Sequence, residues 1–508
     1  MRRFTRTTGA TLFGACARLV DVEVALSGSA GEGPRAFRII GLPDSALREG
    51  RDRVRGAIFH ARWPWPGADV TVNLAPAAAR KEGAALDLPI ALAILGAQEV
   101  MGPDVRLGDL ICLGELGLDG TVRPVRGVLA AVEAARARGL HRAIVAHANA
   151  FEAAAVRGMH VHAVRTLVEA VGYLGGGAEH PAVTPRPWRP ASPSLDAVRA
   201  IRGQATALRA AAIAAVGGHN LLVWGSPGTG KTLVARALIE LMPPLEYEEA
   251  LEVSRIHSAA GLLAEGLVAR RPFRAPHHTT SLAGLVGGGR IPRPGEMSLA
   301  HLGVLFLDEV PEFPRSTLEA LRQPIEDGGL VIGRAAGRAR FPTEVLLVAA
   351  MNPCPCGWRG VGDRCRCTQR DVARYQARIS GPLRDRFDLQ VEMGPVKAED
   401  LVSDATEALA PELEPERRKQ ARKAQIERAR RYGFDRPSNA RIPARLLPRA
   451  VEIDAEAERA FVVKARAIGL TGRGMHRVMR VARTIADLNG SAAVTTDHLH
   501  GAIAFRGA

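Results

Sequence analysis

The chain has 508 residues, 47% of them hydrophobic, which predicts roughly two to four globular domains and excludes a disordered chain. Six cysteines are too few for a disulfide scaffold, and the lack of an apolar run of about 18 residues argues against a membrane span. The net charge of +15 favours an anionic partner such as nucleic acid, although the arginine-rich composition of a GC-rich genome explains it equally well. We expect a cytoplasmic protein.

Residues 1–174 alternate strand-like runs, such as VTVNLAP and HRAIVAH, with helix-like runs such as VLAAVEAARARG. This alternation predicts an α/β or α+β domain. The first residues superficially resemble a signal peptide, but the apolar run before Cys16 is short and interrupted, so secretion is not expected. Residues 175–194 are rich in Gly, Pro and Ser and predict a linker.

Residues 195–396 contain the near-continuous apolar runs NLLVWG, GVLFLDE and EVLLVAAMN. Such runs are typical of buried parallel strands, so this part is predicted to be an α/β domain. Residues 397–508 are highly charged and helix-like, as in ERRKQARKAQIERARR, and predict a small helical domain.

A phosphate-binding loop is predicted after the first of these strands. The segment GSPGTGKT matches the pattern G-x-x-x-x-G-K-[ST] between a strand and a helix, where backbone N–H groups and the helix N-terminus face phosphates. Lys231 is expected to contact the β- and γ-phosphates, and Thr232 to hold Mg²⁺. The predicted ATP-binding residues are Gly225, Ser226, Pro227, Gly228, Thr229, Gly230, Lys231 and Thr232.

Two further strands end in polar residues that suit ATP hydrolysis. The run GVLFLDEV ends in Asp308, predicted to hold Mg²⁺, and Glu309, predicted to act on the attacking water. The run EVLLVAAMN ends in Asn352, which suits positioning of that water; taken alone, this Asn would more often be a turn residue.

Four cysteines lie close together in MNPCPCGWRGVGDRCRC. Four thiolates suit one tetrahedral Zn²⁺, and they leave no open position for a catalytic water, so the site would be structural. The C-x-C pairs are tighter than the usual C-x₂-C, so reduced thiols without metal and a redox role stay open. The candidate ligands are Cys354, Cys356, Cys365 and Cys367.

The other potential metal ligands are isolated. Cys16 and Cys112 have no partner nearby in the sequence and are expected to be packed inside the protein. His277 and His278 are adjacent, but they lack a third ligand at a suitable spacing, so we expect hydrogen-bonded structural or loop residues.

Several segments together resemble AAA+ ATPases of the magnesium-chelatase-like group, specifically the YifB/ComM family. They cover most of residues 195–490, and NLAPAAARKEGAALDLPIAL in the first block resembles the family's domain related to ribosomal S5 and Lon-protease folds. The resemblance implies an S5/Lon-like domain at 1–174, an AAA+ domain at 195–396 and a helical lid at 397–508. The matching segments include LEVSRIHSAAG, RPFRAPHHTTS, LEALRQPIEDG, AAMNPCPCG, SGPLRDRFDL and RVARTIADL.

The resemblance also implies residue roles. Arg386 matches the arginine finger that reaches a neighbouring subunit's γ-phosphate, with Arg384 as a competitor; Arg473 matches the sensor-2 arginine. Asn352 matches sensor 1, and a shared site implies a homo-oligomeric ring, expected to be hexameric. Where Lon-type proteases carry their serine, this chain has Ala85, which has no nucleophile, so the first domain is expected to be non-proteolytic.

Two family insertions are expected to face the pore of the ring. Residues 279–298 are Gly-rich and suit a flexible loop, whereas residues 330–344 predict a β-hairpin with a turn at Ala336-Gly337. Its Arg334, Arg338 and Arg340 suit contact with the DNA backbone without base recognition. The alternative is an ordinary solvated hairpin.

The resemblance therefore implies a hexameric, ATP- and Mg²⁺-dependent motor on single-stranded or branched DNA. Its expected activity is branch migration of recombination intermediates, for example in natural transformation. One alternative is a magnesium-chelatase-like subunit, although such a motor needs a partner with a D-x-S-x-S motif, which this chain lacks. Another is a protein remodeller that uses the first domain as an adaptor.

Overall fold

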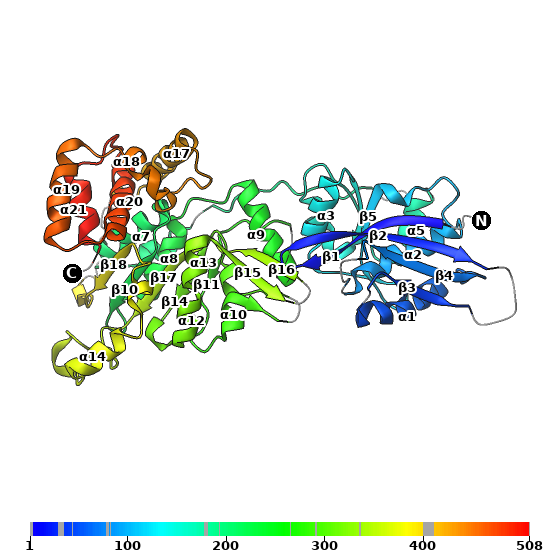
Figure 1. Ribbon diagram of the computed structural model, residues 1–508, viewed down its shortest axis with the longest axis horizontal. Coiled ribbons are helices and arrows are strands. Elements are labelled where there is room, and N and C mark those ends of the chain that lie inside the picture. The colour runs from blue at the N-terminus through cyan, green and yellow to red at the C-terminus, as the bar shows by residue number, and fades with distance from the viewer. Residues whose placement is uncertain are drawn as a thin grey trace.

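The computed structural model describes residues 4–28, 35–42, 44–77, 81, 83–176, 181–192, 194–264, 266–289, 292–334, 337–399 and 411–506. Three parts follow one another along the molecule: an N-terminal sheet with its helices, a central sheet, and a cluster of C-terminal helices beside the central sheet (Figure 1). The predicted α/β class, with a parallel central sheet and a helical C-terminal region, is confirmed.

The N-terminal part is built on a seven-stranded mixed sheet of order β3-β4-β2-β1-β5-β8-β9. Apolar residues alternate with more exposed ones along β4, which is typical of a strand with one buried face. Its strands are β1 (Phe4–Phe13), β2 (Cys16–Ser27), β3 (Phe37–Ile40), β4 (Asp69–Ala75), β5 (Leu110–Leu113), β8 (Arg142–Ala146) and β9 (His160–Val164). Its helices are α1 (Ser45–His60), α2 (Asp87–Ala97), α3 (Val128–Ala137), α4 (Ala150–Ala154) and α5 (Leu167–Leu174).

The central part is a five-stranded sheet of order β11-β14-β17-β10-β18, in which every neighbouring pair is parallel. Strands β14 and β17 are buried along their whole length, which explains their continuous apolar sequences. The strands are β10 (Leu221–Gly225), β11 (Phe273–Arg274), β14 (Val304–Leu307), β17 (Leu346–Met351) and β18 (Leu389–Met393). Nearby helices are α7 (Ala205–Gly217), α8 (Lys231–Leu241), α9 (Tyr247–Ala260), α12 (Arg315–Ala320), α13 (Arg322–Asp327) and α14 (Gln369–Gln376).

Two insertions extend from the central part. The predicted hairpin is confirmed as β15 (Gly329–Arg334) paired with β16 (Gly337–Pro342); Ala336 in its turn lies outside the described residues. Residues 279–298 were expected to form a flexible loop; the described residues of this range, 279–289 and 292–298, instead include short helices and strands. Ser281 caps the first helix, and Leu285 and Met297 are buried, so apolar packing orders this Gly-rich segment. The elements are α10 (Leu282–Val286), β12 (Gly287–Gly288), β13 (Arg293–Pro294) and α11 (Glu296–Leu299).

The C-terminal helices pack on the central sheet. One hydrophobic cluster joins residues of α7, β10 and β17 to residues of α19, α20 and α21. These helices are α17 (Pro415–Tyr432), α18 (Leu447–Ala450), α19 (Ala455–Ala467), α20 (Gly472–Leu488) and α21 (Thr496–Ala504). Among the residues that the structure describes, no helix has the length and apolar character needed to cross a membrane.

Candidate active site

Residues 225–232 connect β10 with α8 in a tight loop. Gly228 and Gly230 have φ angles of 81° and 91°, a region that favours glycine. A Cβ on Gly225 would collide with the carbonyl oxygen of Met393 at the end of β18. Because α8 begins at Lys231, its unpaired N–H groups and positive dipole end lie at this loop, where they suit phosphate binding.

The Lys231 ammonium lies inside this loop. Its Nζ donates to the carbonyl oxygens of Gly225 at 2.7 Å and Ser226 at 2.9 Å, and to Oδ1 of Asn352 at 3.2 Å. Burial lowers the pKa of Lys231, while the charges of Asp308 and Glu309 act in the opposite direction. The structure therefore brings the tip of β17 and the acidic end of β14 to the predicted phosphate site.

Two oxygens suit a Mg²⁺ ion at the edge of the loop. Thr232 Oγ1 donates to Oδ2 of Asp308 at 3.2 Å, and both residues are exposed. Two neighbouring oxygens of an octahedral Mg²⁺, each at about 2.1 Å from the ion, lie about 3 Å apart. The residues present thus fit the ion that an ATP site needs, and neither would have to move far to bind it.

Glu309 follows Asp308 in an unusual backbone conformation. Its φ of 48° lies in the left-handed region, which is uncommon outside glycine and often occurs at functional positions. Its backbone N–H donates to Oδ1 of Asp308 at 2.9 Å, which fixes the turn at the end of β14. The exposed Glu309 side chain lies near enough to Lys231 for its charge to raise the pKa of that ammonium.

Arg386 lies away from the loop of its own chain. Its guanidinium forms an ion pair with Glu326 at the end of α13, and only 13% of its side chain is exposed. Its backbone carbonyl accepts from Nδ2 of Asn220, the residue before β10, at 2.9 Å. The backbone of the Arg386 segment is therefore bound directly to the strand that leads into the phosphate-binding loop.

The other two predicted arginines are more accessible. Arg384 is exposed, with Nε 3.4 Å from Oε1 of Gln390. Arg473 is exposed in the first turn of α20. Among the contacts of the described residues, none joins Arg384, Arg386 or Arg473 to the phosphate-binding loop.

Two neighbours of the site were not predicted. The buried Tyr375 of α14 has its pKa raised to about 12 by burial, while a hydrogen bond from the Asn352 backbone opposes this shift. Gly357 packs on Pro227 of the loop, since a Cβ on Gly357 would lie 2.9 Å from Cγ of Pro227. Both contacts depend on tertiary packing, which the sequence does not reveal. The only signal in the sequence is that residue 357 is a glycine, which suits its φ of 84°.

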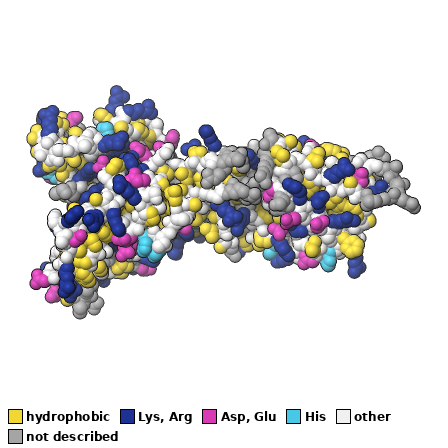
Figure 2. All heavy atoms as spheres, turned by 60° about the horizontal axis from the view of Figure 1, so that its bottom comes forward, with side chains coloured by type: hydrophobic (Ala, Val, Ile, Leu, Met, Phe, Trp, Pro, Cys, Tyr) yellow, Lys and Arg dark blue, Asp and Glu magenta, His cyan; other side chains and the backbone are white. Residues whose placement is uncertain are grey.

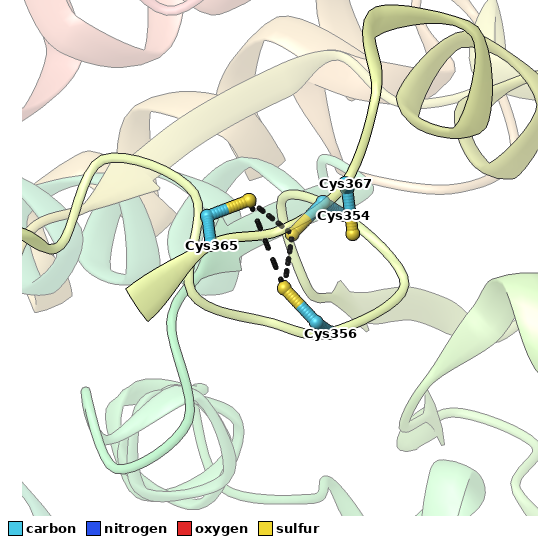
Figure 3. A group of neighbouring side chains, drawn as sticks. All are labelled: Cys354, Cys356, Cys365 and Cys367. Atoms are coloured by element: carbon cyan, nitrogen blue, oxygen red, sulfur yellow. Dashed lines mark hydrogen bonds between the residues drawn. The ribbon is translucent and has the colours of Figure 1, made fainter. Parts of the chain in front are cut away.

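The four clustered cysteines point toward a common centre (Figure 3). Cys354 Sγ lies 3.4 Å from Cys356 Sγ and 3.8 Å from Cys365 Sγ, and all four sulfurs lie within 4.8 Å of one another. Sulfurs bound tetrahedrally at about 2.3 Å from Zn²⁺ lie about 3.8 Å apart. A hydrogen bond from the Trp358 backbone lowers the pKa of Cys356 to about 6, whereas the pKa of Cys365 is raised and that of Cys367 is raised to about 12. The donor set fits a metal.

The two remaining cysteines and the paired histidines were expected to be structural residues, and the structure shows the surroundings of each. Cys112 is buried as expected, but Cys16 is exposed, because it follows the tight β1–β2 turn with its side chain toward solvent. Nδ1 of His277 lies 2.8 Å from Oγ1 of Thr279, and the His277 and His278 rings are 4.0 Å apart. Among the described residues, only the cysteine cluster groups three or more potential metal ligands.

The expected lack of proteolytic activity in the first domain, based on Ala85, stays a prediction. Ala85 lines a cavity of about 300 Å³, together with Thr11, Glu115, Arg126 and Ala131. No Ser, Cys or Lys occurs among the described residues around this cavity.

The strand order defines the class of protein. Strand β17 lies between β10, which leads to the phosphate-binding loop, and β14, which ends at Asp308. This order places Asn352 between the loop and the acidic pair, and the C-terminal helices pack beside the same sheet. The sheet, the loop, the acidic pair and the lid-like helices define an AAA+ ATPase.

Comparison with known proteins identifies the family. Family models described as magnesium chelatase subunit ChlI, subunit ChlI of Mg-chelatase, and magnesium chelatase subunit ChlI C-terminal match residues 197–401, 22–149 and 415–506. Competence protein ComM of Haemophilus influenzae is 39% identical over 97% of this chain and 95% of its own length. YifB of Escherichia coli is 38% identical over 96% of this chain and 94% of its own length. The chain belongs to the YifB/ComM family of magnesium-chelatase-like AAA+ ATPases.

The similarity to a magnesium-chelatase subunit is weaker. The magnesium-chelatase 38 kDa subunit of Rhodobacter capsulatus is 27% identical over 55% of this chain and 77% of its own length.

Proposed function

We propose that this ATPase is a hexameric, cytoplasmic motor that moves along single-stranded or branched DNA and promotes branch migration of recombination intermediates. Natural transformation is one process that would use this activity, consistent with a relative named competence protein. The observation that carries the proposal is the two-faced hairpin β15–β16. Net charge alone does not identify a DNA site, since basic side chains on the face in Figure 2 are interspersed with acidic ones.

The two faces of the hairpin differ in polarity. Residues pair across the strands as Val331 with Arg340 and Ile332 with Ala339. Ile332 and Ala339 are buried, whereas Arg340 is exposed and Val331 is 58% exposed. Side chains of a strand alternate between its faces, so exposed Arg338 shares the outer face with Arg340. The side chain of Arg334 lies outside the described residues.

This outer face suits the backbone of DNA. Two guanidinium groups on a narrow hairpin can bind successive phosphates, and the exposed Val331 opposite Arg340 can contact a sugar or base without recognising sequence. A single strand joins the hairpin to the ATP site, because β16 ends at Pro342 and β17, which starts at Leu346, leads to Asn352. Strand β17 can therefore transmit a change at the γ-phosphate to the arginines.

Replacing Arg338 and Arg340 together by Ala should weaken DNA binding and lower the slope of log affinity against log salt by about 2, since each lost phosphate contact removes about 0.9. Binding of a fluorescent four-way junction over a range of salt concentrations measures both. The control replaces the exposed Arg430 and Arg431 of α17 by Ala, which removes the same charge elsewhere. An equal change in slope in both double variants would contradict a specific role for the hairpin.

The overall proposal is tested by ATP hydrolysis with and without a four-way junction. DNA that accelerates hydrolysis, with loss of this stimulation in the hairpin double variant, would support the motor. Robust hydrolysis that is indifferent to DNA would contradict it and would favour a protein remodeller or a magnesium-chelatase-like subunit.

We further propose that the four cysteines bind one structural Zn²⁺. The sulfur geometry supports this, and four thiolates leave no open position on the ion. A closed site would hold the loop that packs Gly357 on Pro227, and so support one wall of the phosphate-binding loop.

Purified protein should contain one zinc per chain, and Cys365→Ser should lose the metal and lower the melting temperature. Metal analysis by mass spectrometry and thermal unfolding measure the two effects. Cys16→Ser is the control, since Cys16 is exposed and distant in sequence from the cluster. Native protein free of zinc after growth in zinc-containing medium would contradict the proposal.

A further inference from the structure

We propose that the N-terminal domain positions the hairpin β15–β16, so that this domain is part of the DNA-handling element. The contact is made by residues 13–15, the last residue of β1 and the two-residue turn into β2; we call them the hairpin-binding turn. Figure 1 shows the end of β1 beside β15 and β16. The contact between the N-terminal domain and the hairpin follows from the structure alone, whereas its effect on DNA binding rests on the proposed function.

The contact is a shared hydrophobic cluster. Phe13 and the buried Ala15 of the hairpin-binding turn lie in one cluster with residues of the hairpin and of α9 and α11. Gly14 fits closely against the hairpin, since a Cβ on Gly14 would lie 3.0 Å from Cβ of Ala339. The other members of the cluster are Ile256, Ala260, Leu299, Leu330, Ile332, Ala339 and Phe341.

The hairpin needs such support. A two-stranded hairpin is only marginally stable on its own and requires a packed face. Here the packed face includes Ile332 and Phe341. It contacts α9 and α11 of its own domain and the hairpin-binding turn of the N-terminal domain. The guanidinium of Arg18 lies 4.2 Å from the centre of the Phe13 ring, so a cation–π contact holds this ring in place.

Helix α9 fixes the orientation of the two domains. The N–H of Gly127, which precedes α3, donates to the carbonyl of Ser258 at 3.2 Å, and the Ser258 hydroxyl donates to the buried carboxylate of Glu152. Near the start of α9, the Tyr247 hydroxyl donates to the carbonyl of Ala155 at 2.8 Å. Because α9 also contributes Ile256 to the hairpin cluster, the domain contact and the hairpin contact share one helix.

The segment predicted to be a linker adds a second connection. Residues 181–192 have no regular secondary structure, but they are bound to both domains. The N–H of Val183 donates to the carbonyl of Val161 in β9 at 2.7 Å. Nε1 of Trp188 donates to the carbonyl of Val268 at 3.3 Å, and its ring contacts that of Tyr247. The hairpin-binding turn therefore cannot slide past the hairpin without breaking these contacts.

Burial of one hairpin face determines what the other face presents. With Ile332 and Ala339 against the cluster, Arg338 and Arg340 must point away from the N-terminal domain. Releasing the turn would let the hairpin tilt and would separate the arginines from the position that β17 controls. The N-terminal domain thus acts as a positioning element, whether or not it also binds other proteins.

The test is amide hydrogen exchange of full-length Ala15→Asp in the absence of DNA. A carboxylate is costly to bury among the apolar members of this cluster, so exchange of residues 329–342 should accelerate about tenfold or more. Exchange in β5 and α8 should stay unchanged, and Ala15→Ser is the conservative control. If β5 also loses protection, Ala339→Asp introduces the charge from the hairpin side instead. Unchanged hairpin exchange in both Asp variants would overturn the proposal.

DNA measurements on the same variant separate this inference from the proposed function. Loss of DNA-stimulated ATP hydrolysis, with basal hydrolysis within about twofold of the wild type, would support both. Accelerated hairpin exchange with unchanged DNA stimulation would support the positioning contact and contradict the role of the hairpin in DNA binding.

Discussion

Replacing Arg386 by Ala is expected to reduce the rate of ATP hydrolysis by about 10³-fold or more, with little change in nucleotide affinity. The physical reason is that a guanidinium near the transferred phosphoryl group stabilises charge that develops only in the transition state. Steady-state hydrolysis and binding of a fluorescent nucleotide measure the two effects. We propose that Arg386 acts on the phosphate of a neighbouring subunit, because within the single chain its guanidinium contacts Glu326.

Arg384→Ala is the matched control for Arg386→Ala. Arg384 lies two positions earlier, carries the same charge and is more exposed. If its loss abolished hydrolysis while Arg386→Ala remained active, Arg384 would be the arginine finger. Because Nδ2 of Asn220 donates to the carbonyl of Arg386 and not to its side chain, removal of the guanidinium should leave the backbone in place.

Mixing two inactive variants tests whether Arg386 acts between subunits. Arg386→Ala leaves the phosphate-binding loop intact, and Lys231→Ala leaves Arg386 intact. In a mixed ring, a Lys231→Ala subunit would offer its arginine to an Arg386→Ala neighbour, so part of the hydrolysis should return. The absence of any recovery, with rings of mixed composition shown to form, would contradict action between subunits.

Replacing Glu309 by Gln is expected to lower the hydrolysis rate by about 10²–10⁴-fold while ATP still binds. The carboxylate of Glu309 is exposed beside Lys231 and Asp308, at the end of β14, where the attacking water would lie. Glutamine keeps the size of the side chain but cannot accept a proton from that water. Single-turnover hydrolysis and equilibrium binding distinguish loss of chemistry from loss of affinity.

Glu312→Gln is the control for Glu309→Gln. Glu312 lies one turn further on and forms an ion pair with Arg378 at 2.8 Å. Its loss should affect stability more than hydrolysis. Stimulation by a four-way junction should also vanish in Glu309→Gln; persistent DNA-dependent hydrolysis in this variant would contradict the role given to Glu309.

The sequence by itself determined the elements that depend on near neighbours. A glycine pattern followed by Lys231 predicts a phosphate-binding loop, because the backbone angles at Gly228 and Gly230 favour glycine. Continuous apolar runs predicted buried parallel strands, and the spacing of the cysteines predicted a cluster that the structure shows. The hairpin was predicted from the small turn residues Ala336-Gly337 within residues 330–344, and the structure shows its paired strands.

Only the tertiary structure decided which distant segments meet. The packing of Gly357 on Pro227, the pairing of Arg386 with Glu326 and the contact of residues 13–15 with the hairpin join parts of the chain with no common pattern. The short helices and strands among residues 279–289 and 292–298 and the exposure of Cys16 also differed from expectation. The chemistry of an apolar side chain does not specify which other side chain it contacts, so the shape and burial of the whole fold determine such contacts.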